Sequence, residues 1–193
     1  MVKKNGMDLG KFDSIRMEAI KGYADKGQLY AIPIFINFSA LYYNKDIFDK
    51  FGVPYPKDSM TWEETIQLGK QLSRTDGGIQ YRGLDIDAFR NFSTGLSLPL
   101  IDPATEKAAM QTDSWKNTLG LFAEIKKLPG NGSGNAANLF EKDRVLAMLP
   151  AYGSRLGELE EMYNKGTPLN SIWPLTYRLK KRRERRRRSM SIC

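Results

Sequence analysis

Few side chains in this sequence are suited to covalent chemistry, and their scarcity narrows the possible functions. The 193 residues contain no histidine, and the single cysteine, Cys193, is the last residue. A Ser-His-Asp triad, a Cys-His pair, the common zinc sites and a disulfide framework are therefore excluded. Three pairs of carboxylates remain, at Glu63-Glu64, Asp85/Asp87 and Glu160-Glu161. Nothing in their spacing predicts two carboxylates facing each other across a cleft, as glycoside hydrolysis requires, so we interpret them as solvated surface residues.

The positive charge of the chain is confined to its end. The net charge is +8, from 30 Lys and Arg against 22 Asp and Glu. Nine of these basic residues and one of the acidic residues lie between Arg178 and Arg188, so the first 177 residues carry 21 of each and are neutral. One hypothesis is a nucleic-acid or anionic-surface binder acting through this tail, with an affinity that falls steeply with salt.

Composition and apolar spacing predict a globular α/β chain. Hydrophobic residues make up 41% and charged residues 27%, and there is no apolar run of about 18 residues that would indicate a membrane span. The apolar periodicity alternates between that of helices and that of strands. Strands are predicted at Leu29–Ile36 (with a bend at Pro33), Leu41–Tyr43, Ile79–Leu84, Arg144–Leu149 and Ser171–Leu175.

Helices are expected between these strands. The first carries an apolar stripe made by Phe12, Ile15, Ala19, Ile20 and Tyr23. The others are expected at Lys45–Phe51 (ended by Gly52), Thr61–Ser73 (with a capping box of Thr61 and Glu64), Ala88–Ser97, a longer helix capped by Thr112 or Asp113, Ala136–Lys142 and Ser154–Tyr163. The stretch Pro129–Asn135 is predicted to be a flexible loop, because it is rich in glycine and other turn residues. It is not predicted to bind phosphate, because it lacks the Lys-Ser/Thr that completes a phosphate-binding loop.

Four blocks of sequence carry a resemblance to a known family. They are Tyr30–Pro33, Ala40–Pro54, Thr61–Glu64 and Leu139–Met148. The last block looks like the pattern Phe-x-x-Gly-x-x-Ala-Met, with Asp143 where glycine is usual. In order and spacing, the blocks resemble the family 1 extracellular solute-binding proteins, the sugar-binding receptors of ABC importers, to which maltose-binding protein is distantly related. The resemblance covers residues 1 to 176.

The resemblance implies a periplasmic-binding-protein fold of type II, in which two α/β lobes close on a ligand by a hinge. It implies that residues 1–36 are a remnant of the first lobe with a hinge strand, and that residues 37–176 are most of the second lobe. Residues 177–193 would be a basic tail foreign to the family, interpreted as out-of-frame sequence or a truncated gene end. The chain is then expected to be incomplete, without a signal peptide and with only weak sugar binding by itself.

The resemblance also implies which residues contact the ligand. Sugars are bound by flat aromatic faces and by polar side chains that satisfy their hydroxyls. Asn37 would point its amide into the cleft, and the family places an aromatic residue near Phe89. The contacts implied are Asn37, Asp87, Phe89, Arg90, Tyr152 and Gly153. Alternatives remain open: Asn37 could cap a turn, Asp87 could cap a helix, and Phe89 and Tyr152 could pack locally. Phe92, Trp62, Trp115, Tyr42 and Tyr43 are expected to be structural.

The function implied is that of an extracytoplasmic receptor at the cell surface or in the periplasm. It would bind a sugar or oligosaccharide in an interlobe cleft and deliver it to ABC permease subunits in the membrane. We expect a monomer that is not an enzyme, with no catalytic residue, cofactor, metal or specific nucleic acid. Besides the basic-tail hypothesis, a glycosidase remains the third alternative.

Overall fold

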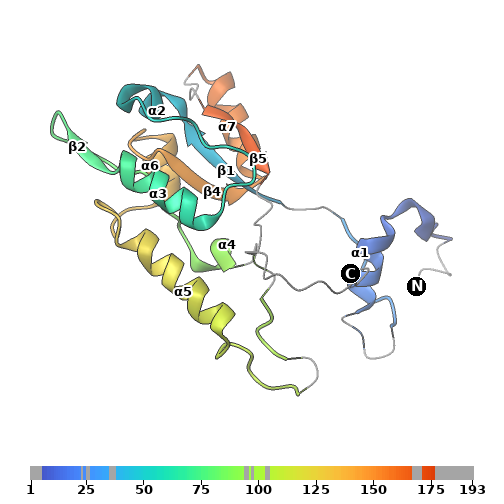
Figure 1. Cartoon of the computed structure of the whole chain (residues 1–193). Helices are drawn as coiled ribbons and strands as arrows, with labels where there is room; N and C mark the ends of the chain where they lie inside the picture. Colours follow the sequence, from blue (N-terminus) through green and yellow to red (C-terminus); the bar gives the residue numbers. More distant parts are fainter. Residues whose placement is uncertain are drawn as a thin grey trace. The chain divides into compact units, whose positions relative to one another are not determined.

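The chain divides into two compact units in the computed structural model. They are Met1–Asn37 with Glu184–Cys193, and Phe38–Arg183. The structure describes residues 6–22, 24, 27–34, 38–93, 96, 98–102, 105–166 and 171–176. The elements are labelled in Figure 1, and each unit is treated by itself.

The smaller unit contains a short 3-10 helix, η2 (Leu9–Lys11), and the helix α1 (Ser14–Lys21). The side chain of Asp13 caps α1. Met17 is the buried residue of α1, whereas Ile15 is 70% exposed. The predicted apolar stripe is therefore wrong at Ile15 and at Ala19, which is also exposed. Its last residue, Tyr23, lies outside the described residues.

The strand predicted at Leu29–Ile36 is absent from its described part, residues 29–34. Tyr30 and Ile34 are 78% and 89% exposed. β-Branched and aromatic residues favour a strand only where a neighbouring strand offers ladder partners, and Pro33 cannot donate to a ladder. The remaining residues of this prediction, Phe35 and Ile36, lie outside the described residues.

The larger unit is built around a sheet with the strand order β4-β1-β5. β1 (Ser39–Asn44) pairs antiparallel with both β4 (Met148–Tyr152) and β5 (Ser171–Thr176), and Ser39 lies opposite Tyr152. The strand predicted at Arg144–Leu149 thus lies a few residues later in the chain. The strand predicted at Ser171–Leu175 is confirmed.

A further segment runs along the free edge of β4. Arg82 forms a parallel bridge with Leu146, and its backbone accepts a hydrogen bond from Ala147 N at 2.8 Å. Three residues on, Asp85 N donates to Met148 O at 3.3 Å. The chain from Arg82 to Asp85 therefore serves as an irregular edge strand, parallel to β4.

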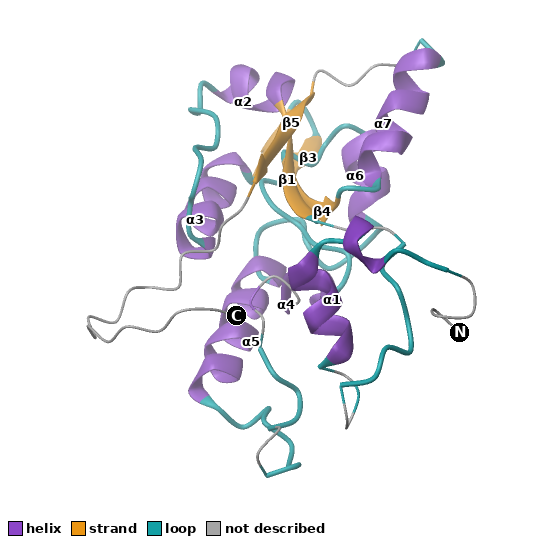
Figure 2. Ribbon diagram, turned by 90° about the vertical axis from the view of Figure 1, so that its right-hand side faces the viewer, coloured by secondary structure: helices purple, strands orange, loops and turns teal. Residues whose placement is uncertain are grey.

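Helices cover both faces of this sheet (Figure 2). One face carries the larger hydrophobic cluster, which includes Leu41, Tyr43 and Met148. The other carries the smaller cluster, which includes Ala40 and Tyr42. The helices that supply the larger cluster are α2 (Lys45–Phe51), α3 (Trp62–Leu72), α4 (Phe89–Ser93) and α5 (Asp113–Lys126), and those that supply the smaller one are α6 (Ala136–Glu141) and α7 (Arg155–Asn164). The mixed α/β fold is thus confirmed.

Most local predictions hold because their signals are carried by adjacent residues. α2 has the predicted bounds, and Gly52 ends it in the left-handed region with φ 63°. The capping box of α3 is present, with Glu64 N donating to Thr61 Oγ1 at 3.2 Å and Thr61 N to Glu64 Oε2 at 2.7 Å. A hairpin of β2 (Arg74–Asp76) and β3 (Ile79–Tyr81) precedes the edge segment.

Predictions about which faces are buried are partly wrong. Trp62, Trp115, Phe92, Tyr42 and Tyr43 are buried as expected. However, Leu119 on α5 is 48% exposed and Tyr163 on α7 is 70% exposed, although the apolar spacing places both on inner faces. The described part of α4 runs from Phe89 to Ser93, and Thr94, Gly95 and Ser97 of the predicted helix lie outside the described residues.

A close contact between two glycines places the edge segment against α3. A Cβ on Gly83 would lie 1.8 Å from the carbonyl oxygen of Gly69, which is far inside van der Waals contact. Ser73 Oγ accepts from Gly83 N and donates to Gly69 O, both at 2.9 Å. The chain leading to Asp85 is therefore held directly on the α3 backbone.

Gly83→Ala is expected to lower the free energy of unfolding by about 3 kcal/mol. The added Cβ would overlap backbone atoms of Gly69, and these cannot move aside without distorting α3. Gly120→Ala is the matched control, since a Cβ there meets nothing within 4 Å on the surface of α5. That change should raise stability by about 0.5–1 kcal/mol. Urea unfolding followed by circular dichroism measures both, and a Gly83→Ala loss below about 0.5 kcal/mol would contradict the close contact.

Candidate ligand-binding site

In the larger unit, β1 begins where β4 ends (Figure 1), and the edge segment ends there too. This end of the strands is called the sheet edge. The edge segment and β4 are parallel, so the residues after Asp85 and the residues after Tyr152 lie at the same edge. β1 is antiparallel to β4 and begins there, directly after Phe38. α4 packs against β4. The structure thus brings Asp87, Phe89, Tyr152 and Gly153 to one edge.

The Tyr152-Gly153 turn is held by β1. The hydroxyl of Tyr42 donates to the carbonyl oxygen of Tyr152 at 3.1 Å, and Gly153 N donates to Phe38 O at 2.7 Å. Burial of Tyr42 raises its pKa, so the hydroxyl keeps the proton that it donates. The main chain of this turn is therefore fixed, while the Tyr152 side chain is only half-buried.

An ion pair holds the other side of the same turn. Arg155, the first residue of α7, donates from Nη1 to Glu141 Oε1 at 2.9 Å and to Glu158 Oε2 at 2.5 Å. Glu141 belongs to α6, and its side chain is 11% exposed. Because the Arg155–Glu141 pair is largely shielded from water, it ties the start of α7 to α6 more firmly than a surface pair would.

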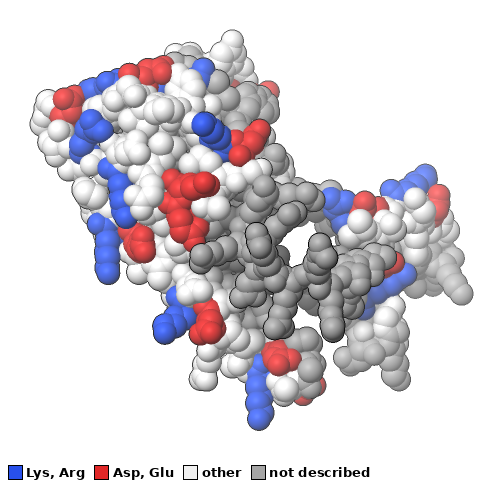
Figure 3. All heavy atoms as spheres, viewed as in Figure 1, with Lys and Arg blue, Asp and Glu red and all other residues white. Residues whose placement is uncertain are grey.

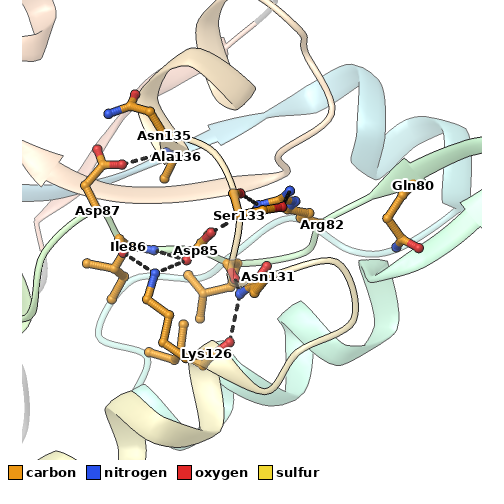
Figure 4. A network of polar contacts seen from close by, with 12 residues as sticks. Gln80, Arg82, Asp85, Ile86, Asp87, Lys126, Asn131, Ser133, Asn135 and Ala136 are labelled. Carbon is orange, nitrogen blue, oxygen red and sulfur yellow. Dashed lines mark hydrogen bonds and ion pairs between the residues drawn. The ribbon is translucent and has the colours of Figure 1, made fainter.

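Asp87 accepts a hydrogen bond at the start of a helix that is distant in the chain. Its Oδ1 accepts from Ala136 N at 2.5 Å, at the start of α6 (Figure 4). A carboxylate at a helix N-terminus satisfies a free amide and faces the positive end of the helix dipole. This oxygen of Asp87 is therefore engaged within the protein.

Phe89 belongs to an aromatic cluster between α4 and α5. Its ring centroid lies 5.1 Å from that of Phe122, 6.1 Å from that of Trp115 and 6.3 Å from that of Phe92. The side chain is half-buried against the larger hydrophobic cluster. This packing favours the structural interpretation of Phe89, and its ligand contact stays a prediction. Asn37 and the side chain of Arg90 lie outside the described residues.

A buried carboxylate holds the segment that leads to this edge (Figure 4). Asp85 is 3% exposed, so its interpretation as a solvated surface residue is wrong. Its Oδ1 accepts from Lys126 Nζ at 2.6 Å and from Ile86 N at 2.8 Å. Its Oδ2 lies 3.5 Å from Arg82 Nη1. The sequence gives one signal of this burial, because Asp85 is flanked by the apolar residues Leu84 and Ile86.

The same network secures the glycine-rich loop. Arg82 donates to Ser133 O at 2.6 Å, and the amide of Asn131 donates to Leu84 O at 2.8 Å and to Ile125 O at 2.7 Å. Lys126 Nζ also donates to Ile86 O at 2.6 Å. The loop and α5 are thus joined to the edge segment by hydrogen bonds whose partners lie 40 to 51 positions apart in the sequence.

The described part of the chain holds no group of three or more side chains suited to a metal ion. None of its helices is long and apolar enough to cross a membrane. Basic and acidic side chains are interspersed over the face shown in Figure 3, in keeping with the neutral charge of the first 177 residues.

The comparisons with known proteins identify the class of protein to which this mixed α/β chain belongs, that of the solute-binding proteins. Residues 4–184 match the family described as bacterial extracellular solute-binding protein. The chain belongs to this family.

Individual relatives match shorter parts. An arabinooligosaccharide-binding protein of Halalkalibacterium halodurans and a mannitol-binding protein of Pseudomonas aeruginosa are each 37% identical over 57 residues, 30% of this chain and 13% of the relative. The solved structure of an ABC transporter solute-binding protein from Agrobacterium vitis, with bound D-mannitol, is 18% identical with a TM-score of 0.59. That match covers 91% of this chain and 45% of the other, so the chain spans about half the length of its structural relative.

Asp85→Asn is expected to lower the free energy of unfolding by about 3 kcal/mol, because Lys126 and Arg82 would lose their buried counter-charge. Asp76→Asn is the matched control, since the Asp76–Lys50 distance of 2.7 Å is close to the Asp85–Lys126 distance of 2.6 Å, but the side chains of Asp76 and Lys50 are 49% and 42% exposed. Its loss should stay below about 1 kcal/mol. Equal losses in urea unfolding would show that the buried network does not hold the edge segment.

Proposed function

We propose that this chain is the substrate-binding component of an ABC importer and that it binds a carbohydrate. The observation that carries the proposal is the convergence of Phe38, Tyr152, Gly153 and the Asp87–Phe89 segment on one sheet edge. In open α/β sheets, ligands bind beyond the carboxyl ends of the strands. Family membership and the sugar and polyol ligands in the relatives' names support the same conclusion.

In this proposal, residues 38–176 of the larger unit belong to the second lobe of a type II periplasmic-binding-protein fold. Its helices lie on both faces of the sheet, and the ligand would occupy the edge described above. The hinge would precede β1, and residues 177–193 would form a basic tail outside the lobe. A ligand that contacts both lobes stabilises the closed state, because that state gains contacts that the open state lacks.

Tyr152 is the residue best suited to hold a sugar. Neither hydrophobic cluster of the described residues includes its ring, although the main chain on both sides is hydrogen-bonded to β1. An aromatic face on a fixed backbone can pack against the C–H face of a sugar with little loss of conformational freedom. Asn37, Asp87, Phe89 and Arg90 would add polar and aromatic contacts.

The family also suggests where the protein works. Its description as extracellular supports a position outside the cytoplasmic membrane. There the receptor would act as a monomer and pass its ligand to the permease subunits of the importer, without catalysis.

Tyr152→Ala should weaken carbohydrate binding about tenfold, by removing the aromatic face. The test is a nitrogen-15 NMR titration of the full chain with arabinotriose, mannotriose and mannitol, which also measures millimolar affinities. At least one of these probes should shift the amide signals of Phe38, Tyr152 and Gly153.

Tyr163→Ala is the control, because it removes an equal ring that is 70% exposed on α7, away from the strand ends. Its binding should match that of the unchanged chain. The absence of shifts with all three probes, or an equal loss in the two variants, would refute the proposed function.

A further inference from the structure

Phe38 is an exposed aromatic residue that neither hydrophobic cluster of the described residues includes. It is 43% exposed, directly before β1, at the same sheet edge as Tyr152. Its backbone oxygen accepts the hydrogen bond from Gly153 N at 2.7 Å. The ring therefore has a fixed attachment point and an open surface, which is the combination that makes an aromatic residue suitable for ligand contact.

Gly153 provides the space in which the Phe38 ring lies. A Cβ on Gly153 would be 2.5 Å from two carbon atoms of that ring, so any larger residue would displace it. The ring thus packs against the main chain of the turn at Gly153. The absence of a side chain at Gly153 therefore allows the exposed ring of Phe38 to lie where it does.

Phe38 and Tyr152 face opposite sides of the strand pair. Ser39 lies opposite Tyr152, and Leu41 opposite Pro150, so Tyr152 is on the face of the larger cluster, which contains Leu41. Phe38 lies opposite Gly153 and alternates with Ala40 and Tyr42, on the face of the smaller cluster. One sugar ring cannot pack against two aromatic rings that are separated by the strand pair itself.

We propose that Phe38 is a second ligand-contacting aromatic residue, and that the ligand is an oligosaccharide whose separate sugar units contact Phe38 and Tyr152. The inference rests on the proposed function and adds a substrate class to it. A chain of sugars that crosses the strand ends reaches both rings, whereas a single sugar or polyol reaches one. Phe38 then contributes to selection by length.

The test compares ligands of one and three units on the full chain. Arabinose, arabinotriose, mannose and mannotriose are titrated by NMR against the unchanged chain and against Phe38→Ala, Gly153→Ala and Tyr152→Ala. Phe38→Ala should weaken binding of a three-unit ligand about tenfold and that of its single unit less than about twofold. Gly153→Ala should act in the same direction, because its methyl group displaces the ring. Tyr163→Ala is the control and should change none of the affinities.

The outcomes separate this inference from the proposed function. A loss in Tyr152→Ala with no loss in Phe38→Ala overturns the role of Phe38 and leaves the receptor function standing. Equal weakening of one-unit and three-unit ligands by Phe38→Ala overturns the selection by length. If none of the four sugars binds the folded chain, both proposals fail. The NMR spectrum of each variant without ligand shows whether it folds.

Discussion

The larger unit depends on the buried carboxylate of Asp85. This one side chain accepts from the ammonium of Lys126 and from its neighbour Ile86, and it lies within reach of the guanidinium of Arg82. An ionised group at 3% exposure is costly unless charges and hydrogen bonds compensate for the lost water. The compensating groups come from α5 and from the edge segment itself, so the charge requires these parts to stay together.

The consequence is a continuous scaffold under the candidate site. Gly83 lies against the backbone of α3. Arg82 is hydrogen-bonded to the chain just before β4, and Asp85 is hydrogen-bonded to Met148, the first residue of β4. Two residues later, Asp87 accepts a hydrogen bond at the start of α6 on the opposite face of the sheet. The chain from Arg82 to Asp87 therefore contacts the helix layer of α3 at its start and that of α6 at its end. These contacts and the hydrogen bonds to β4 determine the direction of the chain at the sheet edge.

Sequence patterns predict the parts of this arrangement that depend on neighbouring residues. The left-handed Gly52 and the Thr61–Glu64 box are each decided within a few residues, and both are present. The burial of Asp85 depends on Lys126, 41 positions away, and the role of Asp87 depends on Ala136, 49 positions away. No local pattern contains such partners. The apolar neighbours of Asp85 are therefore its one local sign of burial, and no local pattern indicates the distant helix start at which Asp87 accepts a hydrogen bond. The strand expected at Leu29–Ile36 also depends on distant partners. Its composition suits a strand, but its described residues, 29–34, form no ladder with another strand.

The candidate site shows the same division between what is local and what is long-range. Family resemblance points to Tyr152 and Gly153, but the reason for their rigidity is the pairing with β1, in which Tyr42 lies 110 positions from Tyr152. Phe38 carries no signal in the sequence, because a phenylalanine before a strand is usually a core residue. Its exposure follows from the glycine opposite it, which leaves room for a ring but supplies no side chain to cover it. The candidate binding surface at this sheet edge thus depends on a pairing register, and no single stretch of sequence contains both of the strands that define that register.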